Sequence, residues 1–569
     1  MFWFLGGTMA LLSPTQRAAV EAWILDDPDE EAAGALGGLL ELADSGDEDA
    51  AAELADGFTG SLTFGTAGLR GKMGAGPNRM NRAVVIRAAA GLSRFLSEEL
   101  PDGFTVVVGY DGRHGSKQFA HDTAAVVEAA GGHALLFNQE TPTPVVAFAL
   151  RHLGADAAVM VTASHNPATD NGYKVYLGGR VVEGSGQGAQ IVPPYDSRIF
   201  ECIESVTSAS GVPRADGGWE TLGGNVVDAY VERVKQIVPH PQADLNIVLT
   251  VMHGVGGGLA TRALDECGFK SVSVVAEQHE MDPDFPTVAF PNPEEEGALD
   301  MALALAQETG ADIVLALDPD ADRVAMALPC GDGDWAQLTG DEVGALLGDY
   351  KIRQAVTEGE PAVFANSLVS SRLLGEMAAH HGLDHAETLT GFKWISRVPN
   401  LTFGYEEALG YCVDPGFVRD KDGISAGVTL AYLAAEAKAG GSTLRDRLDE
   451  LAKQFGLHAT SPLTIRVENP ELLTQAVQDL RTRGVNELGG SPVVETIDLA
   501  KGDPPTNGLL FRTARGDRVV VRPSGTEPKL KCYLEVVEPV EDGNVAAARA
   551  TADQRLGLLK QDMRDLISL

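Results

Sequence analysis

Short apolar runs alternate with longer amphipathic segments along most of the chain. Such runs predict β-strands, and segments with an apolar residue at every third or fourth position predict α-helices. In the first regular unit we expect strands at 104–110, 134–137 and 157–162, separated by helices at 117–130 and 143–152. A polar loop follows the last strand. This alternation is typical of an α/β domain that binds ligands at the carboxyl ends of its strands.

The same plan recurs twice further along the chain. The second unit has predicted strands at 245–251, 271–275 and 312–317, with helices after Gly256 and over 297–309. The third unit is less regular, with a strand near 362–365, a helix at 367–380, a strand before Thr390 and a helix after Gly423. Three polar loops at strand ends, all facing one cleft, would form a natural binding site.

Both ends of the chain depart from this plan. An acidic, alanine-rich helical segment ends near Asp56, and segment 183–218, rich in Gly, Ser and Pro, is an excursion before a helical linker. The last part has predicted strands at 462–467, 493–497, 509–513, 518–522 and 531–537, with helices at 470–483 and 546–567. We therefore expect a helical extension at 1–56, three similar α/β domains at 57–222, 223–345 and 346–458, and a smaller α+β domain at 459–569.

The chain is strongly acidic, with 44 Lys and Arg against 81 Asp and Glu and a net charge of -37. A field of this sign repels polyanions, so neither nucleic acid nor an anionic membrane is expected as a partner. An anionic substrate must then be captured by local positive charge. Four of the scarce lysines lie in the motifs described below: Lys174, Lys393, Lys421 and Lys529.

The cysteines and the first residues bear on the compartment. Five scattered cysteines without a C-x-x-C spacing indicate neither a disulfide framework nor a zinc site, which favours a reducing cytoplasm. The apolar start, residues 1–12, lacks basic residues and is too short to span a bilayer. It is either a weak signal peptide or an upstream start, with Met9 as the alternative first residue, since Ser13 and Pro14 begin a helix.

Residues 162–167 read Thr-Ala-Ser-His-Asn-Pro at the end of a predicted strand. The Asn-Pro pair forces a turn directly after Ser164, so we expect its hydroxyl to be presented rather than buried. A hydrolase is disfavoured, because adjacent serine and histidine seldom form a triad and no G-x-S-x-G motif surrounds the serine. The plain alternative is a strand-end turn.

Residues 318–323 read Asp-Pro-Asp-Ala-Asp-Arg, again directly after a predicted strand. Alternate carboxylates of an extended segment project to one side and repel one another unless a cation neutralises them. Mg²⁺ fits better than Ca²⁺, because an EF-hand loop needs Gly and Glu where this chain has Arg323 and Pro329. Arg323 suits a phosphate at the same place. The alternative is an acidic loop without a ligand.

Residues 522–529 read Arg-Pro-Ser-Gly-Thr-Glu-Pro-Lys between two strands of the last domain. Backbone amides, two hydroxyls, a guanidinium and an ammonium match what a phosphate dianion requires. Taken alone, the segment is also compatible with an ordinary turn.

Together these motifs resemble the α-D-phosphohexomutase family, which includes phosphoglucomutases and phosphomannomutases. The resemblance also rests on residues 65–70, Gly-Thr-Ala-Gly-Leu-Arg, and on residues 405–410, Tyr-Glu-Glu-Ala-Leu-Gly. All five segments occur in the family's order and the resemblance covers nearly the whole chain. It implies four domains in a heart shape around a central cleft, three of them similar and the fourth smaller and mobile.

The resemblance also implies roles for individual residues. Ser164 would be the phosphoserine, and Mg²⁺ would be held by a phosphoserine oxygen and by Asp318, Asp320 and Asp322. The transferring group would be surrounded by Arg70, His165, Lys174 and Arg323, with Lys421 near the reacting hydroxyl. Glu406 would bind sugar hydroxyls. Further substrate contacts are implied at Thr390, Gly391 and Lys393, and the second phosphate would be clamped by Arg522, Ser524, Gly525, Thr526 and Lys529.

The activity implied is that of a phosphosugar mutase, which interconverts hexose 1-phosphate and hexose 6-phosphate. The reaction would pass through a 1,6-bisphosphate that also serves as activator. A monomer or a dimer is expected. Glucose is favoured and mannose is the other hexose expected. Ala408 stands where many hexose mutases have serine. Segments 252–256, 291–295 and 391–394 look like a branch that includes phosphopentomutase and glucose-1,6-bisphosphate synthase, so both activities stay open.

Two further alternatives belong to other classes of protein. An inactive sugar-phosphate sensor would keep the phosphate clamp without the chemistry. A haloacid-type phosphatase is disfavoured, because its first aspartate would be the nucleophile and the Ser164 loop would be unnecessary.

Overall fold

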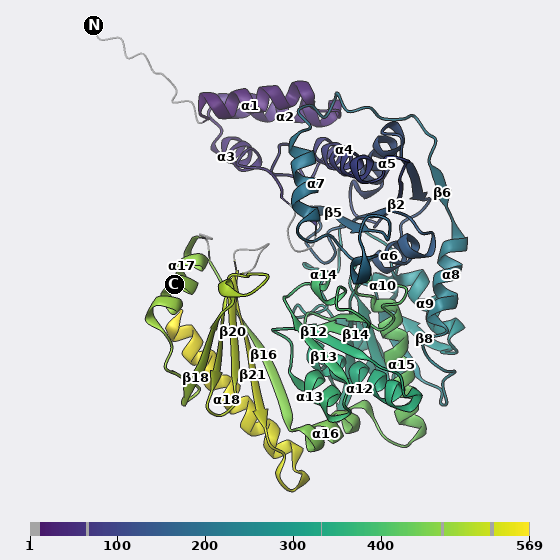
Figure 1. Cartoon of the computed structure of the whole chain (residues 1–569), viewed down its shortest axis with the longest axis vertical. Helices are drawn as coiled ribbons and strands as arrows, with labels where there is room; N and C mark the ends of the chain where they lie inside the picture. The colour runs from purple at the N-terminus through teal and green to yellow at the C-terminus, as the bar shows by residue number, and fades with distance from the viewer. Residues whose placement is uncertain (1–11, 64–67, 332, 468–470, 524–528, 568–569) are drawn as a thin grey trace.

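The protein is described here by a computed structural model that covers residues 12–63, 68–331, 333–467, 471–523 and 529–567. These residues form a helical extension followed by four sheet-containing domains (Figure 1). The expected architecture, three similar α/β domains and a smaller C-terminal α+β domain, is confirmed.

The extension consists of three helices, α1 (Pro14–Asp26), α2 (Glu30–Asp44) and α3 (Glu48–Gly57). Each begins at a side chain that accepts hydrogen bonds from the first-turn amides, namely Ser13, Asp29 and Asp47. Apolar residues of the three helices form a small cluster of their own that packs against Ala83 in the first domain.

The first domain has a six-stranded sheet in the order β1-β5-β4-β2-β3-β6, in which β2, β3, β4 and β6 are parallel. Its strands are β1 (Leu69–Lys72), β2 (Thr105–Tyr110), β3 (His133–Phe137), β4 (Ala157–Val161), β5 (Asp170–Leu177) and β6 (Glu220–Leu222). Its helices are α4 (Arg82–Glu99), α5 (Ser116–Ala129), α6 (Thr143–His152), η1 (Gly184–Gly186) and α7 (Tyr195–Glu204).

Strand β5 was not expected from the sequence. It contains Asn171 and Lys174, which interrupt an apolar run, yet seven of its eight residues are buried. The lysine is tolerated there because carboxylates of the second domain pair with its ammonium.

The second domain has the strand order β11-β10-β9-β7-β8, with β7, β8 and β9 parallel. Its strands are β7 (Asn246–Thr250), β8 (Ser271–Val274), β9 (Ile313–Leu317), β10 (Val324–Gly331) and β11 (Asp334–Gln337). Its helices are α8 (Gly224–Val234), α9 (Gly257–Glu266), α10 (Ala276–His279) and α11 (Asp300–Thr309).

The third domain has the order β13-β12-β14-β15. Its strands are β12 (Val363–Ser367), β13 (Asp384–Thr388), β14 (Leu401–Glu406) and β15 (Gly410–Cys412), and its helices are α12 (Gly340–Glu358), α13 (Leu373–His380), α14 (Phe392–Ile395), α15 (Gly423–Ala439) and α16 (Leu444–Phe455). The helix expected at 367–380 begins only at Leu373, because Ser367 still belongs to β12 and the next residues turn.

The fourth domain is an antiparallel sheet in the order β16-β21-β20-β19-β18-β17. Its strands are β16 (Leu457–Arg466), β17 (Glu487–Leu488), β18 (Ser491–Asp498), β19 (Leu509–Thr513), β20 (Arg518–Pro523) and β21 (Lys529–Glu538). Two long helices, α17 (Glu471–Arg483) and α18 (Val545–Leu566), pack on it, and short 3-10 turns occur at η2 (Leu499–Lys501) and η3 (Glu541–Gly543).

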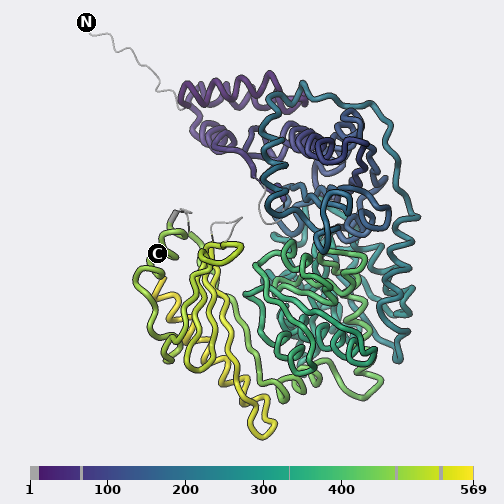
Figure 2. The backbone as a smooth tube through the Cα atoms, viewed as in Figure 1, coloured from purple at the N-terminus to yellow at the C-terminus, as the bar shows by residue number. Residues whose placement is uncertain are grey.

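The apolar cores show how the domains are coupled. The second and third domains share one large core, which also includes residues of α6 from the first domain. The fourth domain has a separate core formed by its own sheet and helices. The chain enters it from α16 directly into β16, beside the third domain (Figure 2). Among the described residues, no helix combines the length and apolar character needed to cross a bilayer.

Candidate active site

Ser164 lies in the tight turn that follows β4. Its backbone is in the left-handed region, with φ of 53°, and the Arg113 guanidinium donates to the carbonyls of Ser164 and Asn166 at 2.6 Å and of Pro167 at 2.7 Å. This buried arginine therefore holds the backbone of the turn in place. Sequence reasoning missed it, although the Asp-Gly-Arg turn at the end of β2 was a usable signal.

The Ser164 hydroxyl meets two groups from different domains. Its Oγ donates to Asp318 Oδ2 at 2.9 Å and lies 3.1 Å from His165 Nδ1. The expectation that this hydroxyl is presented rather than buried was wrong in part, since the residue lines the cleft but is only 2% exposed. Burial, together with the charges of Arg323 and Arg70, lowers the pKa of His165 well below its usual range, so its imidazole is neutral at pH 7.

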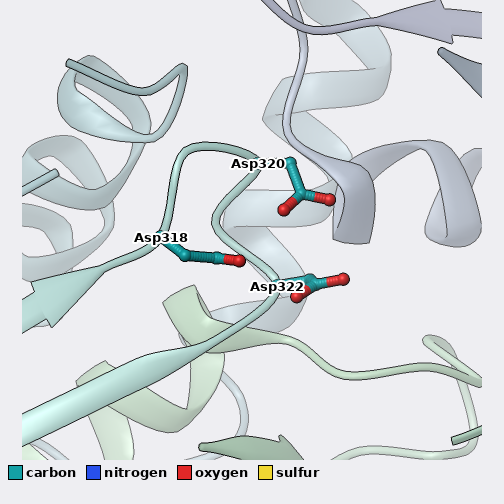
Figure 3. Close-up of side chains that lie close together, drawn as sticks. All are labelled: Asp318, Asp320 and Asp322. Atoms are coloured by element: carbon teal, nitrogen blue, oxygen red, sulfur yellow. The ribbon is translucent and has the colours of Figure 1, made fainter. Parts of the chain in front are cut away.

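Asp318, Asp320 and Asp322 converge in the loop between β9 and β10 (Figure 3). All three are at most 1% exposed, and one carboxylate oxygen from each lies within 4.8 Å of the others. Asp320 Oδ1 and Asp322 Oδ1 are buried without a hydrogen-bond partner among the described residues. Three converging carboxylates with unused oxygens fit a hard divalent cation.

Two lysines partly neutralise these aspartates. Lys174 Nζ lies 2.7 Å from Asp320 Oδ2 and 2.8 Å from Asp322 Oδ2, and Lys421 Nζ lies 3.3 Å from Asp322 Oδ2. Burial opposes charge on Asp322, but the two ammonium groups hold the pKa of its carboxyl far below the usual range. Asp318 has no lysine partner among the described residues. Burial, together with the negative charges of Asp320 and Asp322, raises the pKa of its carboxyl well above the usual range.

The loop of aspartates is supported by residues that sequence reasoning did not single out as site residues. The Thr143 hydroxyl bonds the Asp320 carboxylate, and the Thr143 amide donates to the Asp320 carbonyl at 3.0 Å. Gly254 lies so close to the loop that a Cβ there would be 2.4 Å from Pro319 Cα. Only glycine fits at this contact, which gives the segment 252–256 a packing role against the aspartate loop.

Arg323 links the aspartate loop to the third domain. Its Nη1 donates to the Ala408 carbonyl at 2.8 Å, and its Nη2 lies 3.9 Å from Glu406 Oε1. Arg70, from β1, donates to the Asn166 side chain at 3.0 Å. Arg70 and Arg323 both line the cleft with Ser164, so two guanidinium groups and the hydroxyl belong to the same cleft.

The fourth domain contributes the far side of the cleft. Arg522 bonds the Thr390 hydroxyl, and Arg522, Lys529, Thr390 and Gly391 all line the same cleft as Ser164. The predicted residues Ser524, Gly525 and Thr526 lie outside the described residues, as do positions 65–67 of the first motif. Lys393 does not line the cleft, and its ammonium lies 5.9 Å from the centre of the Trp394 ring.

The cleft has a volume of about 1140 Å³ and draws its walls from all four domains. Three segments that are distant in sequence therefore converge on it: the serine turn, the aspartate loop and the cationic end of the last sheet. One end of the cleft has a hydroxyl beside carboxylates that could hold a cation, and the other end has basic side chains. This arrangement suits transfer of a phosphoryl group on a substrate with two reactive ends.

Comparison with known families gives a match in each domain. The models for phosphoglucomutase/phosphomannomutase alpha/beta/alpha domains I, II and III match residues 61–210, 228–331 and 339–455, and that for the C-terminal domain matches 464–552.

Similar proteins agree with these matches. A probable phosphomannomutase of Haemophilus influenzae is 44% identical over 460 residues, covering 80% of this chain and 93% of that protein. A phosphopentomutase of Homo sapiens is 34% identical over 544 residues, covering 86% of this chain and 87% of that protein. The crystal structure of a putative phosphomannomutase from Thermus thermophilus has the same fold, with a TM-score of 0.66, 24% identity and coverage of 88% of this chain and 100% of that one.

Proposed function

We propose that this chain, which belongs to the phosphoglucomutase/phosphomannomutase family, interconverts hexose 1-phosphate and hexose 6-phosphate through a phosphorylated Ser164. Membership of the family makes it a phosphosugar mutase, an isomerase that acts by intramolecular phosphoryl transfer. The choice of a hexose, with glucose ahead of mannose, is part of the proposal. So is a cytoplasmic location, which the scattered, unpaired cysteines support.

The observation that carries the proposal is the contact between Ser164 and Asp318, at 2.9 Å. It puts a nucleophilic hydroxyl against a cluster of carboxylates that fits Mg²⁺. When bound there, Mg²⁺ would neutralise negative charge on the transferring phosphoryl group and help to align it.

The residues around Ser164 have matching roles in the transfer. In the forward step a sugar hydroxyl attacks the phosphorus and gives up its proton, the bond between phosphorus and the Ser164 oxygen breaks, and that oxygen takes up a proton to leave Ser164 as a free hydroxyl. Arg70 and Arg323 stabilise the phosphoryl oxygens, and Lys174 and Lys421 keep the acidic loop from repelling them. In the return step Ser164 must lose its proton, and neutral His165 Nδ1 is a base within reach of it.

The two ends of the sugar are handled by different parts of the cleft. While one end reacts at Ser164, Arg522 and Lys529 hold the phosphate at the other end. The bisphosphate intermediate must then turn around, so the holding site has to recognise phosphate rather than a particular sugar carbon. A guanidinium and an ammonium meet that requirement. Movement of the fourth domain, which has its own core, would allow this reorientation and would exclude water during transfer.

A second candidate function is pentose-phosphate mutase. It is favoured by Ala408, which lacks the hydroxyl that would help to hold a hexose, and by the similarity to a protein named phosphopentomutase. A pentose has one fewer hydroxyl to satisfy, so the loss of this group would cost its binding less.

One coupled assay tests these proposals. Purified protein is given glucose, mannose or ribose 1-phosphate with Mg²⁺ and a trace of glucose 1,6-bisphosphate, beside a Ser164→Ala variant. We expect highest turnover on glucose 1-phosphate, and loss of nearly all turnover in the variant. Undiminished activity of Ser164→Ala would reject the phosphoserine. A preference for ribose 1-phosphate would select the second candidate, and an absence of both turnover and phosphate on Ser164 would indicate a sensor.

A further inference from the structure

The segment 292–295 forms part of the cleft wall in the second domain, and the proposed chemistry does not use it. Asn292 is buried, and its side-chain oxygen accepts from the Glu294 amide at 3.1 Å. Gln337 donates to the Pro293 carbonyl at 2.9 Å. Hydrogen bonds on both sides therefore fix the backbone from which the Glu294 side chain projects.

The Glu294 carboxylate faces the cleft without a hydrogen-bond donor of its own among the described residues. Its side chain is 41% exposed and lines the cleft, and Oε2 lies 3.9 Å from Arg323 Nη1. That separation exceeds the roughly 2.7–3.2 Å of a direct N–H···O hydrogen bond. A carboxylate that is open to the cleft, but not bonded, retains its capacity to accept from a ligand.

Glu406 occupies a similar position on the other side of the same guanidinium. Its Oε1 lies 3.9 Å from Arg323 Nη2, and its carboxylate also lacks a hydrogen bond among the residues that the structure describes. Arg323 Nη1, the atom nearest Glu294, is the one that donates to the Ala408 carbonyl. Through Arg323, Glu294 is therefore linked to the main-chain carbonyl of Ala408, the residue that stands where many hexose mutases have serine.

We propose that Glu294 is a specificity-determining residue, which accepts a hydrogen bond from a ring hydroxyl of the sugar across Arg323 from Glu406. The assignment rests on the proposed function, since it requires a phosphosugar in this cleft. In this proposal Glu294 supplies a second hydrogen-bond acceptor for the sugar, in place of the serine that is missing at position 408. Because Glu294 belongs to the second domain and Glu406 to the third, the two carboxylates would accept hydrogen bonds from the sugar ring on different walls of the cleft.

Steady-state kinetics of Glu294→Ala and Glu294→Gln test this inference. Glu296→Gln is the matched control, because Glu296 is exposed two residues away and does not line the cleft. The substrates are glucose 1-phosphate and its 2-deoxy, 3-deoxy and 4-deoxy analogues. We expect kcat/KM of Glu294→Ala on glucose 1-phosphate to fall by about tenfold to a hundredfold. The glutamine variant should lose less, because its amide oxygen still accepts a hydrogen bond, and the control should match wild type.

The deoxy analogues distinguish a sugar contact from a structural effect. The loss caused by Glu294→Ala should largely vanish for the analogue that lacks the bonded hydroxyl, because that interaction is already absent in the wild-type complex. An equal loss on all four substrates, or no loss on any, would overturn the assignment while wild-type turnover left the hexose mutase function intact. Wild-type protein that turned over none of the hexose phosphates would reject both the assignment and the hexose mutase function.

Discussion

The Ser164 hydroxyl donates a 2.9 Å hydrogen bond to Asp318, a residue 154 positions further along the chain and in another domain. Both residues lie in turns that follow a buried parallel strand, β4 in one sheet and β9 in the next. The contact therefore depends on how the first two domains pack together. It makes the reactive centre sensitive to each of the elements that hold these two turns.

The aspartate loop should bind one Mg²⁺ in solution. Replacing Asp320 by Asn removes one of the three carboxylates and should weaken Mg²⁺ binding by more than about tenfold, with a parallel loss of turnover. Isothermal titration calorimetry measures the affinity directly. Asp284→Asn, at an exposed position of the same domain, is the control and should bind as wild type does. Equal affinity in all three proteins would place the cation elsewhere.

Arg113 should control the rate of transfer rather than substrate affinity. It donates to backbone carbonyls of the serine turn and does not line the cleft. Lysine cannot reproduce these several bonds, so Arg113→Lys should lower kcat by about tenfold or more and leave KM almost unchanged. Initial-rate kinetics separate the two effects, with Arg94→Lys on the exposed face of α4 as control. A rise in KM at unchanged kcat would contradict the positioning role.

Glu535 should be the main polar attachment of the fourth domain. This residue is 1% exposed and accepts from Ser371 Oγ at 2.9 Å and from Arg372 Nε at 2.7 Å in the third domain, and it lies 3.1 Å from Arg518. Glu535→Gln removes the counter-charge of Arg372 and one of the two carboxylates beside Arg518, and should lower the free energy of unfolding by about 3 kcal/mol.

Urea unfolding, with hydrogen exchange of residues 457–538, measures that effect. Glu495→Gln is the matched control, since Glu495 pairs with Arg512 at the surface of the same domain and should contribute less than about 1 kcal/mol. Comparable losses in the two variants would mean that Glu535 does not attach the domain.

His458 should make that attachment depend on pH. Burial alone would lower its pKa, but the carboxylates of Glu376 and Glu535, which lie 3.6 Å and 3.3 Å from its two ring nitrogens, outweigh burial and raise the pKa to about 8. The folded protein binds the proton more tightly than the unfolded chain, whose histidine titrates near about 6.5. Its stabilising contribution, about 2 kcal/mol, is therefore complete below about pH 6.5 and is lost as the pH rises through about 8.

The comparison of wild type with His458→Gln isolates this contribution. The difference in unfolding free energy between the two should shrink between about pH 6 and pH 9 by about 2 kcal/mol. A difference that stayed constant over this range would show that folding does not raise the pKa of His458.

Much of the architecture could be predicted from the chain itself. Strands such as Thr105–Tyr110 and Ile313–Leu317 are continuous apolar runs, and helices such as Thr143–His152 show clear periodicity, so local pattern was sufficient to locate them. Prediction failed at β5, where Lys174 breaks the apolar run, and at the start of α13, where serine-rich turns continue beyond the strand. In both places contacts with distant residues override the local pattern.

The order of residues along the chain fixes which side chains are available for chemistry: a serine before an Asn-Pro turn, alternating aspartates after a strand, and a cationic loop in the last domain. Folding in three dimensions is what pairs Lys174 with the aspartates, holds the serine turn against Arg113, and places Glu294 and Glu406 beside one guanidinium. The reason is physical. A motif depends on neighbours along the chain, whereas each of these contacts joins residues from separate elements, whose proximity is set by packing between strands and domains.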